Sequence, residues 1–141
     1  MVFIGQQKSF FRSSVMNEIR GDRHYTETHE WVVDNGDGSF TLGITDYAQE
    51  SLGDLVFVEL PVEGDSVDAS SPLCVVESVK SASDVHAPVD LEILDINQTL
   101  DSDPELVNSD CYDDGWLVKF SADSIDGLMD AASYQDFLES E

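Results

Sequence analysis

Lys80 is the residue whose type and setting most invite chemistry. It stands in the run ESVKSAS at residues 77–83, and after Arg23 the only other lysine or arginine is Lys119. The whole chain carries 30 acidic against six basic side chains, for a formal charge of −24. A primary amine kept among small residues in so acidic a chain needs a reason.

Three interpretations of this lysine remain open at the level of its neighbours. As a solvated side chain it would pair loosely with Glu77 or Asp84, which is worth at most about 1 kcal/mol. As a catalytic amine it would have to lose its proton, whereas the neighbouring carboxylates favour the ammonium form and the sequence has no glycine-rich phosphate loop. As a modification site it would project from a narrow loop whose small flanking residues let a modifying enzyme approach. The sequence weighs the first and third interpretations almost equally.

The residues that most often bind metals lack the spacing of a metal site. His24, His29 and His86 are not spaced as ligands, and Cys74 and Cys111 lie far apart with no CxxC motif. We therefore predict no metal site and no disulfide.

The acidity of the chain limits its partners. A strongly negative surface repels phosphate backbones, which argues against nucleic acid and favours partners with basic docking surfaces. No apolar run approaches the roughly 20 residues of a membrane span, so we expect a soluble protein without a membrane partner. Because salt screens self-repulsion, the composition predicts a cytoplasmic protein of a salt-adapted prokaryote.

The predicted elements that must position Lys80 are mostly strands. Apolar runs at residues 31–33 and 40–44 flank the turn sequence NGDG at 35–38, which predicts a hairpin because asparagine and glycine tolerate positive φ. Residues 45–53 predict a short helix with Thr45 or Asp46 at its start and Gly53 at its end. Further strands are predicted at residues 56–60, 73–79 and 116–120, an alternating strand at 85–93, a loop at 101–111, and helices at 124–129 and 133–138.

Lys80 therefore falls between two predicted strands, at or near a hairpin tip. Many short strands followed by helices indicate a mainly β fold, a small barrel or sandwich with short appended helices. A chain of 141 residues fits one domain of this kind.

The first fifteen residues differ from the rest. They contain Lys8 and Arg12 but no acidic side chain. This composition fits a short targeting segment, which would make the protein mitochondrial, or a disordered tail, or an upstream extension if Met16 is the true start. We predict that residues 1–23 form a tail outside the fold and that residues 24–141 form the domain.

Five blocks of the sequence resemble the H-protein family, the lipoyl carriers of the glycine cleavage system. They occur in the order and spacing of that family across nearly all of residues 24–141. The blocks are HYTETHEW, LGITDYAQESLGDLVFVELPVEGDSV, VVESVKSASDVHAPV, DPELVNSDCYDDGW and the helical end with ASYQDFLES. ESVK alone would be a weak signal, whereas five ordered blocks are a strong one.

The resemblance implies a hybrid barrel-sandwich of the lipoyl/biotinyl-carrier type, in which Lys80 carries (R)-lipoate in amide linkage as N6-lipoyllysine. It implies a non-catalytic carrier protein of glycine catabolism and one-carbon metabolism, which shuttles the aminomethyl group of glycine. The implied partners are the P protein (the decarboxylating glycine dehydrogenase), the T protein (aminomethyltransferase), the L protein (dihydrolipoamide dehydrogenase) and a lipoate-attaching enzyme. In this division of labour the cofactor carries the chemistry and the protein supplies attachment and orientation.

The resemblance also assigns contacts for the loaded arm. By position in the family they fall on Thr28, Glu30 and Asp84, where a hydroxyl and two carboxylates would hold a cationic amine. A surface hydroxyl and two solvated acids are the alternative interpretation, and the general acidity of the chain weakens the signal from any one acid. The sequence departs from the family at Asp90-Leu91, where Ser-Gly is usual, and we expect a regular strand there because Leu91 does not adopt positive φ cheaply.

Three alternatives to the cleavage carrier remain. An H-like relay that donates lipoyl groups to 2-oxoacid dehydrogenases would share ESVK. A biotinyl carrier would present its lysine in the same hairpin, but such domains favour methionine on both sides of the lysine, where this chain has Val79 and Ser81. An unmodified interaction module is the third.

Overall fold

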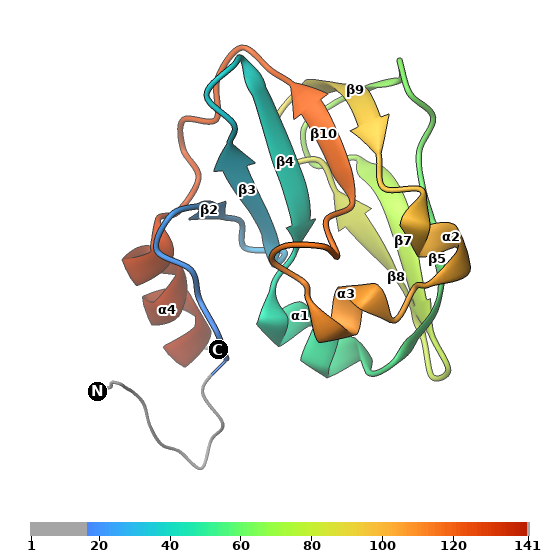
Figure 1. The fold of residues 1–141 in the computed structure, drawn as a ribbon. Coiled ribbons are helices and arrows are strands. Elements are labelled where there is room, and N and C mark those ends of the chain that lie inside the picture. Colours follow the sequence, from blue (N-terminus) through green and yellow to red (C-terminus); the bar gives the residue numbers. More distant parts are fainter. Residues whose placement is uncertain (1–16, 141) are drawn as a thin grey trace.

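The computed structural model describes residues 17–140, which fold into two antiparallel sheets with four short helices (Figure 1). The larger sheet has the order β2 (His24–Tyr25), β3 (Glu30–Asp34), β4 (Ser39–Ile44), β10 (Val118–Ser121), β9 (Leu91–Ile96) and β6 (Ser66–Val67). The smaller has the order β5 (Leu55–Glu59), β7 (Pro72–Ser78) and β8 (Ala82–His86). The helices are α1 (Asp46–Leu52), α2 (Thr99–Ser102), α3 (Leu106–Ser109) and α4 (Ala131–Glu139). The predicted mainly β fold class is confirmed.

The hairpin of β3 and β4 forms as predicted. Gly36 and Gly38 adopt φ of 84° and 91°, which side chains with a Cβ rarely tolerate. The Asn35 N–H donates to the carbonyl of Ser39 at 3.0 Å and closes the turn. This pairing fixes the register of β3, the strand that carries Glu30.

Helix α1 begins and ends at the predicted residues. The Thr45 hydroxyl accepts a hydrogen bond from the N–H of Ala48 at 3.2 Å, as an N-cap should, and Gly53 ends the helix at φ 83°. In Figure 1 this helix lies below the sheets, beside the tip of the hairpin formed by β7 and β8.

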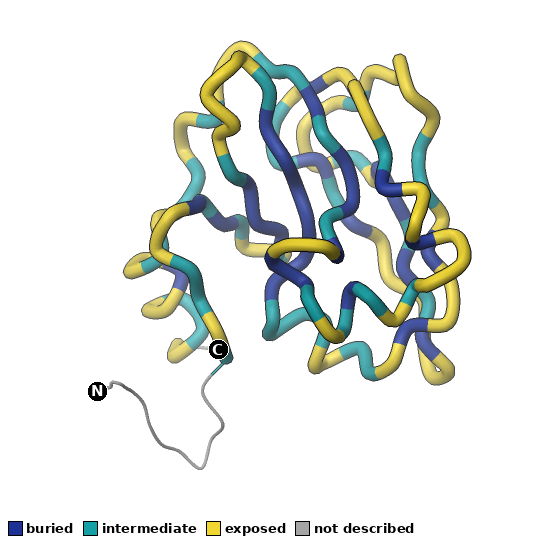
Figure 2. The backbone as a smooth tube through the Cα atoms, viewed as in Figure 1, coloured by how far each residue is buried: buried dark blue, intermediate teal, exposed yellow. Residues whose placement is uncertain are grey.

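The main core lies between the two sheets. Figure 2 shows β4 buried along most of its length, and Val118 and Phe120 of β10 are buried beside it. The inward side chains of the smaller sheet pack against these two strands. The members of this cluster that are at most 1% exposed are Val32, Leu42, Leu55, Val58, Val76, Ile93, Leu100, Val107, Leu117, Val118 and Phe120. Burial of such side chains is the main stabilising contribution, at roughly 1.5–3 kcal/mol each.

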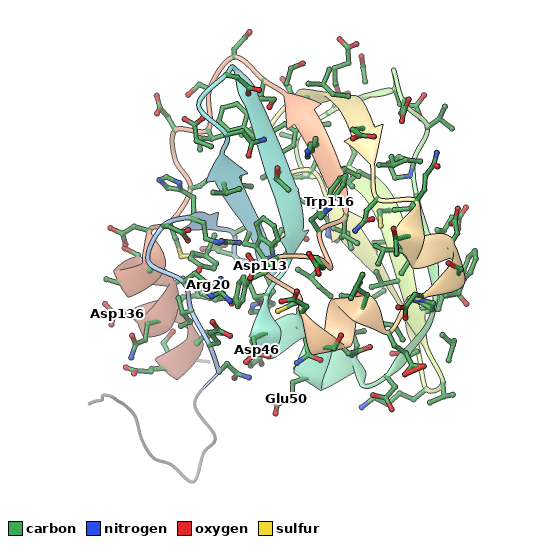
Figure 3. The ribbon with its side chains drawn as sticks, in the orientation of Figure 1. Arg20, Asp46, Glu50, Asp113, Trp116 and Asp136 are labelled. Carbon is green, nitrogen blue, oxygen red and sulfur yellow. The ribbon has the colours of Figure 1, made fainter. Side chains whose placement is uncertain are left out.

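An aromatic cluster on the outer side of the larger sheet holds residues that were predicted to lie outside the fold. Arg23 is only 7% exposed, donates to the Tyr112 carbonyl at 2.8 Å and stacks over the Trp31 ring at 4.6 Å. Nη1 of Arg20 lies 3.3 Å from Oδ2 of Asp113, and Figure 3 labels both residues. Residues 17–23 therefore belong to the packed domain, because their two arginines find aromatic and acidic partners in it. The rest of the segment that was predicted to be a tail, residues 1–16, lies outside the described residues.

The predicted strand at residues 85–93 is in fact two strands in different sheets. β8 ends at His86 in the smaller sheet and β9 begins at Leu91 in the larger one. Pro88 in the connection has no N–H for a ladder. The alternation continues through the break because both strands enclose the same core, and Leu91 is buried as the first residue of a regular strand, as predicted.

Two further predictions at the C-terminal side were wrong. The predicted loop at residues 101–111 contains the end of α2 and all of α3. The predicted helix at 124–129 is not helical: Gly127 takes φ 95°, and Met129 exchanges backbone hydrogen bonds of 2.8 and 2.9 Å with Tyr25. This bridge to the sheet edge outweighs the helical pattern. The helix predicted at 133–138 is confirmed within α4.

Candidate functional site

Lys80 lies at the tip of the hairpin between β7 and β8, in a tightly held turn. The Ser78 N–H donates to the Ser81 carbonyl at 2.8 Å, and the buried Ser78 hydroxyl accepts the N–H groups of Lys80 and Ser81 at 3.3 and 3.2 Å. Val79 is 85% exposed, and Lys80 is exposed beside it. The tip therefore projects its side chains into solvent from a backbone that is fixed by hydrogen bonds.

The lysine side chain lies close to the end of α1. A Cβ placed on Gly53 would lie 3.6 Å from Cε of Lys80, so the aliphatic part of the lysine rests near this glycine. Gly53 adopts φ 83°, which the helix end requires, and the absence of its side chain keeps the space beside the lysine open. The Lys80 side chain thus lies near the end of α1 at Cε, while the residue as a whole is exposed to solvent.

Within residues 17–140, Lys80 is the one lysine or arginine without a charged or aromatic partner for its side chain. The other three cations are each occupied. Arg20 pairs with Glu18 and Asp113, Arg23 pairs with Asp22 and stacks on Trp31, and Nζ of Lys119 lies 5.1 Å from the Trp116 ring. The Lys80 amine is thus free for covalent attachment, and this fits an acylated lysine.

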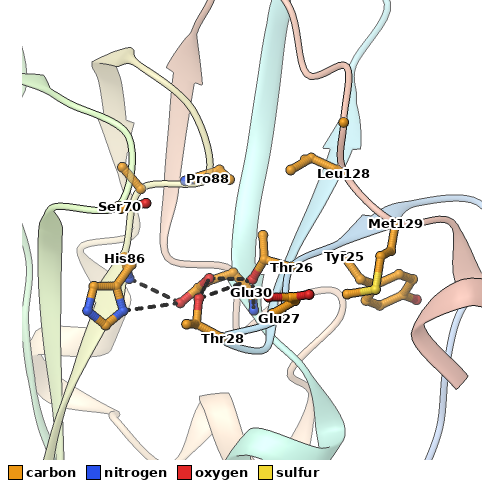
Figure 4. Close-up of a pocket in the computed structure, with 12 residues that line it drawn as sticks. Tyr25, Thr26, Glu27, Thr28, Glu30, Ser70, His86, Pro88, Leu128 and Met129 are labelled. Atoms are coloured by element: carbon orange, nitrogen blue, oxygen red, sulfur yellow. Dashed lines mark hydrogen bonds and ion pairs between the residues drawn. The ribbon is translucent and has the colours of Figure 1, made fainter. Parts of the chain in front are cut away.

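A cleft of about 450 Å³ opens where the two sheets meet (Figure 4). One wall is the segment from Tyr25 to Glu30, and the others come from Ser70, from residues 86–88 at the end of β8 and from residues 127–129. Figure 4 shows the Glu30 carboxyl between the two threonines of the first wall and the imidazole of His86. Within residues 17–140, no group of three or more His, Cys, Asp or Glu side chains is arranged to hold a metal.

Glu30 is a buried acid whose oxygens are all engaged. It is 1% exposed; Oε1 accepts the hydroxyls of Thr26 and Thr28, both at 2.5 Å, and Oε2 accepts the backbone N–H of His86 at 3.0 Å. Burial raises the pKa of the Glu30 carboxyl, and the hydrogen bonds offset part of the rise.

The raised pKa makes the charged form of Glu30 a cost to the fold. The stabilising contribution of a carboxyl whose pKa is raised on folding is complete below its unfolded value, near 4.5, and is lost as the pH rises through the folded value. At neutral pH a cation that enters the cleft beside Glu30 would therefore stabilise the charged carboxylate.

A short closed loop brings Thr28 and Glu30 together. The Thr26 N–H donates to the Glu30 carbonyl at 3.0 Å, and His29 in between adopts φ 73°, an uncommon conformation for a residue with a Cβ. Tyr134 of α4 supports this conformation, since its hydroxyl lies 2.8 Å from Nδ1 of His29. The C-terminal helix thus holds the loop that presents the two oxygens.

The three residues assigned by resemblance occupy two places. Thr28 and Glu30 line the cleft in direct contact, whereas Asp84 does not line it. Asp84 is exposed on β8, on the same side of the strand as His86 and between that residue and the Lys80 tip.

Thr26 and His86 also contact Glu30, and the sequence did not single them out for this site. The repeat of threonine at alternate positions before Glu30 was a usable signal for Thr26. The contact of His86 spans 56 positions and carried none.

The comparisons with known proteins agree with this geometry. The family model of the glycine cleavage H-protein matches residues 23–141. The chain belongs to this family. It is 59% identical over 124 residues to the glycine cleavage system H protein of Ruthia magnifica subsp. Calyptogena magnifica, covering 88% of this chain and 100% of that one. The identity to the protein of the same name from Pseudoalteromonas atlantica is 53% over 129 residues, covering 89% and 100%.

A solved structure of the family has the same fold. The crystal structure of a glycine cleavage system H protein from Mycobacterium marinum superposes with a TM-score of 0.80 at 38% identity, covering 86% of this chain and 99% of that one. This similarity agrees with the barrel-sandwich predicted from the sequence. In the part of the chain from residue 17 to residue 140, no helix is both long and apolar enough to cross a bilayer.

Proposed function

We propose that the chain is the lipoyl carrier of the glycine cleavage system, with Lys80 as its attachment point. The observation that carries the proposal is the accessible amine, free of ion pairs, on a rigid hairpin tip in a chain of this family. The cofactor is (R)-lipoate in amide linkage to Nζ of Lys80. When bound, its dithiolane would supply a disulfide that is reduced as it accepts the aminomethyl group of glycine, and the resulting dithiol would afterwards be reoxidised.

The chain's own residues attach, position and shield, and we assign them no catalytic step. Acylation removes the charge of Lys80. The hydrogen bonds of Ser78 fix the backbone of the turn from which the arm extends. Asp84 lies on the way from the tip to the cleft and would attract a cationic end group. Glu30 and Thr28 would receive that group in the cleft, where burial excludes water and strengthens the charge interaction.

Glu30→Ala is expected to speed the loss of an amine from the loaded arm. In this loss the carbon–sulfur and carbon–nitrogen bonds both break. The oxygen of one water becomes the formaldehyde oxygen, and its two protons go to the sulfur and the nitrogen, so that a thiol, formaldehyde and ammonium are formed. Removal of a buried, hydrogen-bonded charge partner is worth about 2–4 kcal/mol, so a rise of at least tenfold in the rate is expected. Release of formaldehyde and ammonia from purified loaded protein measures it. Glu63→Ala is the matched control, because Glu63 is an exposed glutamate in a turn that does not line the cleft. An unchanged rate in Glu30→Ala would make Glu30 a structural acid only.

The proposed partners are the P, T and L proteins and a lipoate-attaching enzyme. Each has to approach the Lys80 tip, whose surroundings are acidic and carry Asp54, Glu77 and Asp84. Complementary basic surfaces on the partners would raise association rates at low salt.

Exchange of bicarbonate into the carboxyl group of glycine tests the carrier function directly. Lipoylated protein mixed with the P protein is expected to support this exchange, and protein without the acyl group is not. A lipoylated sample that supports no exchange but transfers its lipoyl group to 2-oxoacid dehydrogenases would replace the cleavage carrier by the relay.

We further propose a cytoplasmic location in a cell of high ionic strength. Support comes from the formal charge of −24, because charge repulsion at this level is screened by salt. The midpoint of thermal unfolding is expected to rise between low and molar KCl. A midpoint that stays level or falls would remove the basis for salt adaptation.

A further inference from the structure

The imidazole of His86 contains a buried polar atom that the fold leaves unsatisfied. Its Nδ1 is shielded from solvent and has no hydrogen-bond partner among residues 17–140. The same nitrogen lies 4.0 Å from Oε2 of Glu30, the oxygen that accepts the backbone N–H of His86. Buried nitrogens in native proteins are almost always hydrogen-bonded, so this one points to a state of the cleft in which it acquires a partner.

The titratable groups around this ring are acids, apart from the ring itself. Among the described residues that line the cleft there is no lysine or arginine, and the walls at Ser70 and at residues 127–129 contribute no titratable side chain. By element, the titratable groups that line the cleft with His86 are Tyr25 on β2, Glu27 in the loop before β3 and Glu30 on β3. Asp84 lies outside the lining, on the same side of β8 as His86. A positive charge beside Glu30 must therefore come from His86 or from a ligand.

We propose that His86 is a positioning residue of the cleft, whose imidazolium competes with the ammonium of an amine-bearing Lys80 arm for the Glu30 carboxylate. The inference rests on the proposed carrier function, because that function supplies the amine. With a neutral ring, Glu30 is available to the arm. With a protonated ring, Glu30 has a cation of its own, and Nδ1 donates toward the carboxylate that it now faces at 4.0 Å.

The competition fixes the direction of a pH effect. Histidine is the side chain that ordinarily changes charge between pH 5 and 8. The arm should therefore be held at pH 8 and displaced at pH 6. Two cations that compete for one anion are negatively coupled, and couplings between sites in proteins are ordinarily about 5- to 150-fold. We expect the protection of the amine to fall about two- to fourfold from pH 8 to pH 6 through this route, because an ordinary histidine is only partly protonated at pH 6.

The loaded protein provides the first test. The rate of amine release is measured at pH 6 and pH 8 for the wild type, His86→Gln and His24→Gln, each divided by the rate for a free loaded lipoamide at the same pH. His86→Gln keeps the backbone N–H that binds Glu30 and removes only the titrating ring. His24 is a matched control, because its Nδ1 is also buried without a partner in the described part of the chain but does not line the cleft.

The expected result is a normalised rate that rises about two- to fourfold at pH 6 in the wild type and in His24→Gln, but not in His86→Gln. An equal rise in all three proteins would overturn the role of His86. So would the absence of any rise in the wild type.

A second test needs neither the acyl group nor any partner enzyme. In isotopically labelled protein without the arm, the Cε1 resonance of His86 and the Cδ resonance of Glu30 are followed against pH. Because interacting groups titrate together, each resonance is expected to show an inflection at the midpoint of the other. In Glu30→Gln the inflection that the His86 resonance shares with Glu30 is expected to disappear.

The two tests separate this inference from the carrier function. Independent titration of the two groups in the wild type would overturn the inference even if Glu30→Gln failed to fold. If the protein cannot be loaded at all, the carrier function fails, and the titration still decides whether His86 and Glu30 are coupled.

Discussion

Lys80→Arg is expected to abolish glycine–bicarbonate exchange while it leaves the fold intact. A guanidinium keeps the positive charge of the side chain but is not a substrate for amide formation with a carboxylic acid. The side chain is exposed at a hairpin tip whose turn is held by Ser78, so the free energy of unfolding should change by no more than about 0.5 kcal/mol. Exchange with purified P protein and thermal unfolding measure the two effects.

Lys119→Arg is the matched control for this substitution. Lys119 is the other lysine of the described residues, and its amine lies over the Trp116 ring rather than at the hairpin tip. Because arginine also stacks on aromatic rings, this variant should keep full exchange activity. Exchange that survives in Lys80→Arg would show that the acyl group is attached elsewhere.

Gly43→Ala is expected to destabilise the fold strongly. A Cβ at this position would lie 2.5 Å from Cζ2 and 2.8 Å from Nε1 of Trp31, its partner across the β3–β4 ladder. Trp31 cannot move away easily, because it is buried, donates to the Cys111 carbonyl at 3.0 Å and lies under Arg23. Overpacking of this kind costs about 1–3 kcal/mol, and we expect the upper end.

Urea denaturation of Gly43→Ala measures the effect. Gly21→Ala serves as the control, since a Cβ there would meet no atom within 4 Å. If the two variants unfold at the same urea concentration, Trp31 is held less firmly than its contacts indicate. The expected loss would also reach Arg23 and so loosen the segment of residues 17–23.

Much of the fold was predictable because its signals are local. The turn NGDG, the capping Thr45 and the terminal Gly53 act within a few residues, and the structure has each of them in the expected role. The strand predicted through Pro88 was wrong because the alternation of buried side chains reports which face meets the core, not which sheet the strand joins. Both β8 and β9 face the same core, so the pattern carried no sign of the crossing.

The candidate site likewise has a part that local sequence predicts and a part that depends on long-range contacts. Lys80 was recognisable because its neighbours in sequence are also its neighbours in the turn, and Thr28 and Glu30 fall in one loop. The partnership of Glu30 with His86 joins β3 to β8 across the cleft, so only the folded chain reveals it. The same holds for the support that His29 receives from Tyr134, which lies 105 positions away.

The central claim is that Nζ of Lys80 carries a lipoyl group, and intact-mass spectrometry of protein purified from its own cells tests it most directly. The account predicts that the wild-type protein gains the mass of one lipoyl group in amide linkage, that fragmentation places it on Lys80, and that Lys80→Arg has no added mass. An unmodified wild-type protein, a biotinyl group in place of the lipoyl group, or an acyl group on another residue would contradict it.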